Sequence, residues 1–163
     1  MPQLLSLKAL SLRAFFENPI FLSTASSLFI AQLIKTVIFL LCHRRRRNAR
    51  ETIEIAIWRT GGMPSSHSAV VCALTASVAF VEGPTSNLFL FSFWFAMVVL
   101  RDALGVRRAA GLQAKALNHL GRQAAEKSGL DFHAVKEIQG HSPLEVVLGG
   151  LLGIFIAAGF ALL

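Results

Sequence analysis

Two histidines in this sequence stand where helices are expected to begin, and both have neighbours that could support chemistry. His141 and Glu145 are four residues apart in the segment His141-Ser142-Pro143-Leu144-Glu145. Residues at this spacing share a helix face, so the carboxylate can accept one imidazole N–H and leave the other ring nitrogen as a nucleophile or base. The plainer interpretation is a capping histidine with a glutamate in the first helical turn, where the helix dipole favours negative charge. An ionisable residue at the edge of an apolar helix is costly without a partner, which favours the pair.

The second histidine closes the stretch Gly61-Gly62-Met63-Pro64-Ser65-Ser66-His67, directly before an apolar run. Pro64 suits the first turn of a helix, and Ser65 and Ser66 offer hydroxyl and backbone N–H groups there. A helix N-terminus with free N–H groups can bind an anion. His67 could equally be a simple cap residue.

Basic side chains that could join these histidines occur in two other places. Lys35 lies in an apolar segment, about two turns before its end, a depth that a long side chain can span by snorkelling. Arg107 and Arg108 follow another apolar segment, with Asp102 nearby as an ion-pair partner. A snorkelling lysine and ordinary charge beside a membrane are the plainer interpretations of these three cations.

Taken together, these residues match the needs of phosphoryl transfer, which requires cations and N–H donors around the phosphate oxygens, a nucleophile and an acid for the leaving oxygen. The phosphate oxygens could be bound by Lys35, Arg107, Arg108 and the backbone N–H groups of Ser65 and Ser66. The nucleophile and the acid could be His141 and His67. No Asp, Glu, Cys or His cluster has metal-ligand spacing, so the sequence indicates no metal and no other cofactor.

The elements that must position these residues are predicted to be membrane helices. Of the 163 residues, 54% are hydrophobic and only 15% are charged, against about 25% charged in a soluble domain. Four apolar segments, about 19–42, 68–81, 88–100 and 144–163, are separated by polar stretches and by the turn signal Glu82-Gly83-Pro84. We therefore expect an all-α integral membrane bundle of about four transmembrane helices, the second and third of them short.

The remaining segments complete a single membrane domain over residues 1–163. Residues 1–17 are predicted to form an amphipathic interfacial helix; a cleaved signal peptide is the rival, but Lys8 and Arg13 interrupt its apolar run. Residues 105–140 are predicted to form a basic cytoplasmic loop with helix over 109–125. Cys42 and Cys72 lie in or beside apolar segments, and two thiols make no disulfide framework.

The formal net charge of +7 is concentrated in two loops. One contains Arg44 to Arg47, Arg50 and Arg59, and the other contains Arg107, Arg108, Lys115, Arg122, Lys127 and Lys136. The positive-inside rule places both loops in the cytoplasm, which brings both histidines to the same membrane face. Nucleic-acid binding is the other interpretation of a basic chain, but bilayer-length apolar segments disfavour it. The expected partners are membrane lipids, and a homo-oligomer is compatible with the sequence.

Three separated motifs resemble the divergent type-2 phosphatidic acid phosphatase (PAP2) family, also labelled acid phosphatase/vanadium-dependent haloperoxidase-related. They are Gly61-Gly62-Met63-Pro64-Ser65-Ser66-His67-Ser68-Ala69, then Asp102-Ala103-x-Gly105-Val106-Arg107-Arg108-x-x-Gly111-x-Gln113-Ala114-x-x-Leu117-Asn118, and Gly140-His141-Ser142-Pro143-x-Glu145-Val146. Gln32 and Lys35 in the first apolar segment fit as well, and the resemblance runs from about residue 18 to the C-terminus.

The resemblance implies the metal-independent phosphohistidine mechanism of the parent superfamily. His141 would attack phosphorus, Glu145 would orient it in place of the usual aspartate, and His67 would protonate the leaving alkoxide. The phosphate would be bound by Lys35, Ser65, Ser66, Arg107 and Arg108, with Asp102, Gln32, Asn118 and Lys136 in support. Two departures stand out: the parent motif of lysine, six residues, arginine and proline is absent, and Val135 replaces the arginine six residues before the nucleophile.

The sequence thus predicts a membrane-embedded hydrolase, a lipid phosphate phosphatase with its active site at the cytoplasmic interface of a bacterial cytoplasmic membrane. Its candidate substrates are phosphatidylglycerophosphate, phosphatidic acid and isoprenyl phosphates. The alternatives are a membrane protein that binds or transports a lipid phosphate without catalysis, and a purely structural membrane protein.

Overall fold

The described secondary structure is helical throughout, as the apolar segments predict. The computed structural model describes residues 12–42, 62–129, 131–137 and 140–162. The helices are α2 (Pro19–Cys42), α4 (Ser66–Glu82), α5 (Asn87–Arg101), a π-helical turn η1 (Asp102–Val106), α6 (Arg107–Ser128) and α7 (Pro143–Ala161). These bounds confirm the four predicted apolar helices to within about two residues at most ends.

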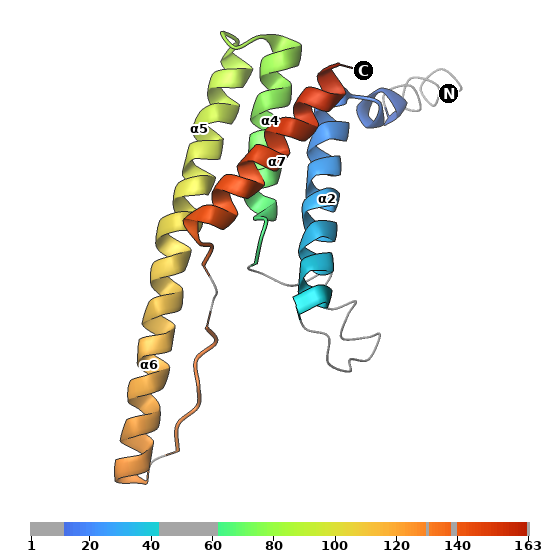
Figure 1. Cartoon of the computed structure of the whole chain (residues 1–163). Helices are drawn as coiled ribbons and strands as arrows, with labels where there is room; N and C mark the ends of the chain where they lie inside the picture. The colour runs from blue at the N-terminus through green and yellow to red at the C-terminus, as the bar shows by residue number, and fades with distance from the viewer. Residues whose placement is uncertain (1–11, 43–61, 130, 138–139, 163) are drawn as a thin grey trace, which may run out of the picture.

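Helix α4 is the central element of a four-helix bundle and packs against α7, α2 and α5 (Figure 1). Ser65 caps its N-terminus by accepting from the Ser68 N–H, and Gly83, at a φ of 88°, follows its last residue. Only glycine adopts that φ without strain, which explains why the turn signal ends the helix there.

Small residues form the core of the bundle, and large apolar side chains point outward. Helix α2 buries every fourth residue from Ser23 to Phe39. A Cβ added to Gly149 would lie 2.3 Å from the Ser65 carbonyl oxygen, and one added to Gly153 would lie 2.1 Å from that of Ala69. Backbones that approach this closely are typical of helix packing in lipid. The most exposed aromatic side chains include Phe29, Phe91, Trp94 and Phe155.

Three helices are long and apolar enough to cross a membrane: Pro19–Cys42, the continuous 42-residue helix Asn87–Ser128, and Pro143–Ala161. Helix α4, with 17 residues, is a shorter apolar helix. The prediction of a membrane helical bundle is confirmed, whereas the count of four spanning helices is not.

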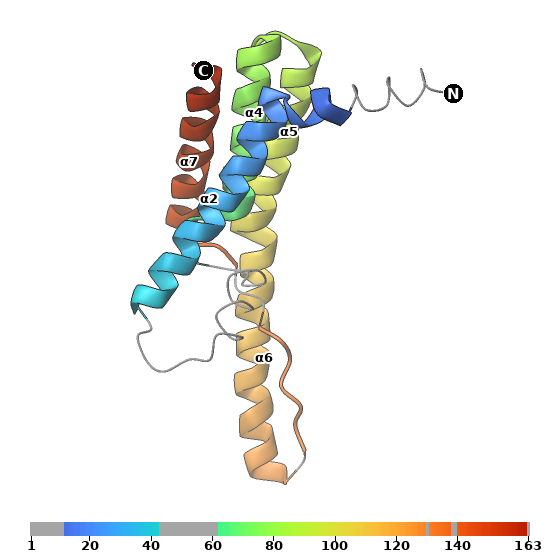
Figure 2. The same ribbon diagram turned by 90° about the vertical axis from the view of Figure 1, so that its right-hand side faces the viewer.

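The chain does not leave the helix after α5, although the sequence suggests an end at Arg101 and Asp102. Helix α5 continues through η1 into α6, which extends well beyond the end of the bundle in both views (Figures 1 and 2). No proline stands at this junction, and Gly105 within η1 does not adopt the positive φ that ends a helix. The change from apolar to polar residues there marks the end of the bundle rather than the end of the helix.

The chain then returns beside α6. Gly129, at a φ of 67°, ends α6, and residues 131–137 run back along it. Residues 12–16 are helical, but most of the predicted interfacial helix over 1–17, and the arginines between 43 and 61, lie outside the described residues.

Candidate active site

The ends of four helices meet at one end of the bundle, where the predicted site residues gather. The C-terminus of α2, the N-termini of α4 and α7, and the start of α6 lie there, as both views show (Figures 1 and 2). Segments that are far apart in the sequence therefore contribute to one site.

His141 and Glu145 form the pair that their spacing predicts. The Nδ1 atom of His141 lies 2.8 Å from Oε2 of Glu145, and His141 is only 6% exposed. The Glu145 carboxylate also accepts from the Ser142 N–H, while the Ser142 hydroxyl accepts from the Glu145 N–H, which makes a capping box at the start of α7. Helix capping and histidine orientation are thus performed by the same carboxylate. Nε2 makes no hydrogen bond to any described residue.

A backbone contact joins this pair to the Pro-Ser-Ser-His stretch. The Ser65 N–H donates to the Glu145 carbonyl at 3.0 Å. Gly149, one turn further along α7, has no side chain and lets the two backbones approach. Because its N–H is used here and its hydroxyl caps α4, Ser65 supports the site by fixing α4 against α7. The Ser66 N–H remains the one predicted to face a phosphate.

Lys35 reaches the start of α4 from the middle of α2. Its side chain is 5% exposed, and its Nζ donates to the Ser66 hydroxyl at 3.3 Å. Gly62, at a φ of 90°, lies above the Lys35 side chain, and a Cβ there would be 3.7 Å from its Cγ. The first predicted cation is therefore buried next to the helix start that is predicted to bind an anion. Gln32, one turn earlier on α2, is half-buried on the same side.

His67 faces both the other histidine and the cations. The ring centroids of His67 and His141 are 6.3 Å apart. Besides His141, the charged side chains near His67 include Arg107, Lys35 and Asp102. The two ring planes are tilted by 58°, so the imidazoles are near neighbours that do not stack.

Two consecutive arginines, Arg107 and Arg108, follow the π-helical turn and have different surroundings. A π-turn brings residues five apart onto one face, so Arg107 pairs with Asp102 through Nε and Oδ2 at 2.6 Å. Turns of this kind are frequent at functional sites. Arg107 acts on His67, whereas Arg108 lines a cavity with His141. The predicted support from Asp102 thus takes the form of an ion pair.

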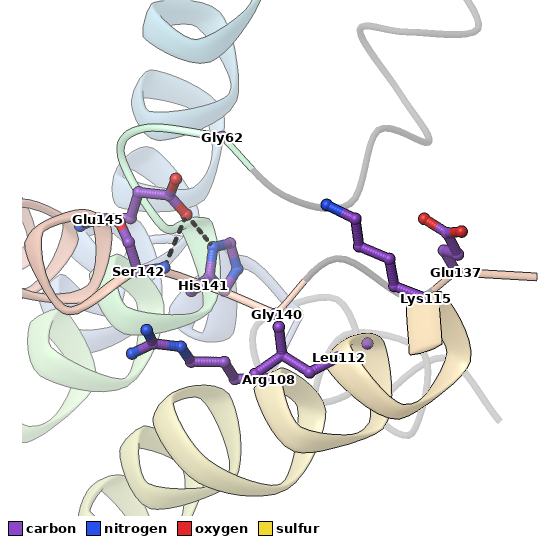
Figure 3. Close-up of a pocket in the computed structure, with 10 residues that line it drawn as sticks. Gly62, Arg108, Leu112, Lys115, Glu137, Gly140, His141, Ser142 and Glu145 are labelled. Carbon is purple, nitrogen blue, oxygen red and sulfur yellow. Dashed lines mark hydrogen bonds and ion pairs between the residues drawn. The ribbon is translucent and has the colours of Figure 1, made fainter. Parts of the chain in front are cut away.

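That cavity, called the polar cavity below, has a volume of about 370 Å³, and most of the residues that line it are polar or charged (Figure 3). It is lined by Gly62, Arg108, Gly111, Leu112, Lys115, Glu137, Gly140, His141, Ser142 and Glu145. Gly140 makes the contact between the His141 segment and α6, because a Cβ there would lie 2.3 Å from the Arg108 Cα. Lys115 is a lining residue that is not among the predicted site residues, although its position seven residues after Arg108 puts both on one helix face.

The buried Asn118 holds the returning segment to α6 rather than touching the histidines. Its amide donates to the Val135 carbonyl and to Glu137 Oε1, both at 2.9 Å, and accepts from the Val135 N–H at 2.8 Å. Lys136 is exposed and is not among the residues that line the cavity. Asn118 therefore supports the site indirectly, by holding Glu137, which lines the cavity. Lys136 does not line the cavity.

An apolar groove of about 1320 Å³ adjoins the polar cavity. The same two elements form walls of both: Arg108 and Glu145 face the cavity, while Ala109 and Val146 face the groove. Further from the cavity the groove is lined by Trp94 and Ile154 among others, which are exposed on the outside of the bundle. His141 and Glu145 thus lie next to the junction between an apolar space and a polar one.

This fold and site define a polytopic helical membrane protein with a histidine–carboxylate pair at one end of its bundle. The sequence profile of the divergent PAP2 family matches residues 16–156, and the chain belongs to that family. It is 40% identical over 148 residues, 83% of this chain and 89% of the other, to the uncharacterized membrane protein YuiD of Bacillus subtilis (strain 168). No solved structure matches the chain.

Proposed function

We propose that this protein is a membrane-embedded lipid phosphate phosphatase that acts through a phosphohistidine intermediate without a metal. The observation that carries the proposal is the 2.8 Å contact between His141 Nδ1 and Glu145 at the junction of a polar cavity and an apolar groove. A carboxylate on Nδ1 fixes the tautomer in which Nε2 has the free lone pair. This is the form of histidine that attacks an electrophile.

In the first step, His141 Nε2 attacks phosphorus and the bond from phosphorus to the alkoxide oxygen breaks. The leaving oxygen takes a proton from His67, whose ring lies 6.3 Å from that of His141, so an alcohol and a phosphohistidine are formed. Lys35, Arg107, Arg108 and the Ser66 N–H stabilise the negative charge on the equatorial oxygens.

In the second step, water attacks the phosphohistidine. His67, now neutral, takes a proton from the water as it adds to phosphorus. The bond from phosphorus to nitrogen breaks, its electron pair returns to Nε2, and inorganic phosphate is released. Both histidines are then back in their starting forms.

The apolar groove supports a lipid as the substrate. Its walls are almost entirely hydrocarbon, and it runs beside helices that are long enough to cross a membrane. An acyl or isoprenyl chain in the groove would place its phosphate near His141. Phosphatidylglycerophosphate, phosphatidic acid and isoprenyl phosphates are the candidate substrates, at the cytoplasmic face of a bacterial cytoplasmic membrane.

The test is phosphate release by the purified protein in detergent from a panel of lipid phosphates. We expect turnover that is insensitive to EDTA and inhibited by vanadate, a mimic of the five-coordinate phosphoryl state. The variant His141→Ala should lose about a thousandfold or more, since a nucleophile is removed. His119→Ala, an exposed histidine on α6, is the matched control and should turn over normally. No release from any lipid, or full activity in His141→Ala, would contradict the proposal; retained lipid binding without release would favour a carrier.

A further inference from the structure

The polar cavity contains two cations on the side that leads away from the bundle. Arg108 and Lys115 are seven residues apart on α6, two helical turns, so they share a face about 10 Å apart along the axis. Figure 3 shows both side chains extending from one helix into the cavity that His141 lines. Among the described residues, neither forms an ion pair.

The acidic residues of the same cavity are already bound to other groups. Glu145 accepts from His141 and from the Ser142 N–H. Glu137 accepts through Oε1 from Asn118, which is 4% exposed. Neither carboxylate forms an ion pair with Arg108 or Lys115, so the guanidinium and the ammonium group can both donate to an anion in the cavity. Such a cavity suits an oxyanion of high charge.

A phosphate released from His141 has two neighbouring spaces. The groove is apolar, and moving a charged group into it without a partner is costly. The polar cavity instead runs along α6, which extends beyond the bundle (Figures 1 and 2). The first cation from His141 on that side is Arg108, and Lys115 follows two turns further out.

We propose that the outer end of this cavity, around Lys115, is a second phosphate site about two helical turns beyond Arg108 and the His141 end, and that it receives the inorganic phosphate released by hydrolysis at His141. Lys115 holds the product on the aqueous side, and Arg108 contacts it first. The inference rests on the proposed function for its source of phosphate. The same chemistry would also recognise a second phosphate on a lipid headgroup, and the experiment below separates these two sources.

The first arm needs no turnover: inorganic phosphate is titrated calorimetrically into the purified full chain, with chloride at equal ionic strength as the reference. We expect Lys115→Gln to weaken phosphate binding about tenfold, the effect of one charge-assisted hydrogen bond. Lys127→Gln is the matched control, because Lys127 lies on the same helix and does not line the cavity. Equal phosphate affinity in wild type and Lys115→Gln, or no binding by wild type, would overturn the proposal.

The second arm uses turnover. Product inhibition by added phosphate should weaken in Lys115→Gln by the same factor as the binding constant. Lys115→Gln could instead lower kcat/KM for a lipid with two phosphates, relative to a lipid with one phosphate, and leave the binding of free phosphate unaltered. In that case the site binds the second phosphate of a lipid headgroup, and the role in product release is wrong. If the protein shows no turnover but its phosphate binding depends on Lys115, the proposed function is wrong and the second phosphate site is supported.

Discussion

At the scale of single residues, Glu145 connects three parts of the site. Its carboxylate orients His141 and caps α7, and its carbonyl accepts the Ser65 N–H that starts α4. The first two contacts follow from local spacing, so the sequence predicts them. The third joins backbones from two distant segments and depends on the absence of a side chain at Gly149. The residue type at position 65 therefore does not predict this hydrogen bond.

Replacement of Glu145 by glutamine tests whether its charge or its shape matters. An amide oxygen can still accept from Nδ1, but it does not stabilise the positive charge that develops on the imidazole. We expect lipid phosphate turnover to fall about 10- to 100-fold in Glu145→Gln, as for loss of a hydrogen bond to a charged group, and further in Glu145→Ala. Initial rates on the best substrate of the panel measure this, with Glu126→Gln on the exposed surface of α6 as the control. Wild-type rates in both Glu145 variants would show that Glu145 does not orient His141 for the reaction.

At the scale of helices, glycines decide how α7 packs against α4. Gly149 and Gly153 contact the α4 backbone, whereas Gly159, near the C-terminus of the same helix, has nothing within 4 Å of the Cβ position. The sequence shows small residues in this helix and predicts close packing. It does not show which glycines make the contact, because that depends on the rotation of α7 about its axis.

The substitutions Gly153→Ala and Gly159→Ala separate these two classes. A Cβ at position 153 would lie 2.1 Å from the Ala69 carbonyl oxygen, so backbone must move at a cost of about 1–3 kcal/mol. We expect the apparent Tm of Gly153→Ala in detergent to fall by several degrees. Gly159→Ala should match or slightly exceed wild type, because alanine favours helix. Equal Tm values for the two variants would contradict the α4–α7 packing described above.

At the scale of the whole molecule, the sequence predicts the helices better than their connections. The apolar segments and their caps set most helix ends, since Gly83 and the Ser142-Pro143 pair stop and start helices by known backbone preferences. The continuous helix through η1 could not be predicted from the sequence. Charged residues at a membrane edge mark the end of the apolar stretch, but they do not indicate whether the backbone stays helical. The polar cavity was missed for a related reason: it requires the return of residues 131–137 along α6.

The arrangement of the helix ends gives a topological prediction. The turn after α4 and the tip of α6 lie at opposite ends of the molecule (Figure 1). In a background with Cys42→Ser and Cys72→Ala, we expect Thr85→Cys to react with an impermeant thiol reagent in intact cells and Ala125→Cys to react only after permeabilisation. Reaction of both from one side would contradict a spanning bundle, and the reverse pattern would place the site outside the cytoplasm.

The length of α4 has a consequence for the bilayer itself. A helix of 17 residues rises about 26 Å, against a hydrocarbon thickness of about 30 Å. With Gly83 at one interface, its first residues, Ser66 and His67, end below the opposite interface unless the lipid thins around them. Hydrophobic mismatch at α4 therefore falls on the helix start that is predicted to bind an anion. The depth of Ser66 and His67 in the bilayer therefore depends on membrane thickness. Reconstitution in lipids of graded acyl-chain length changes that thickness directly.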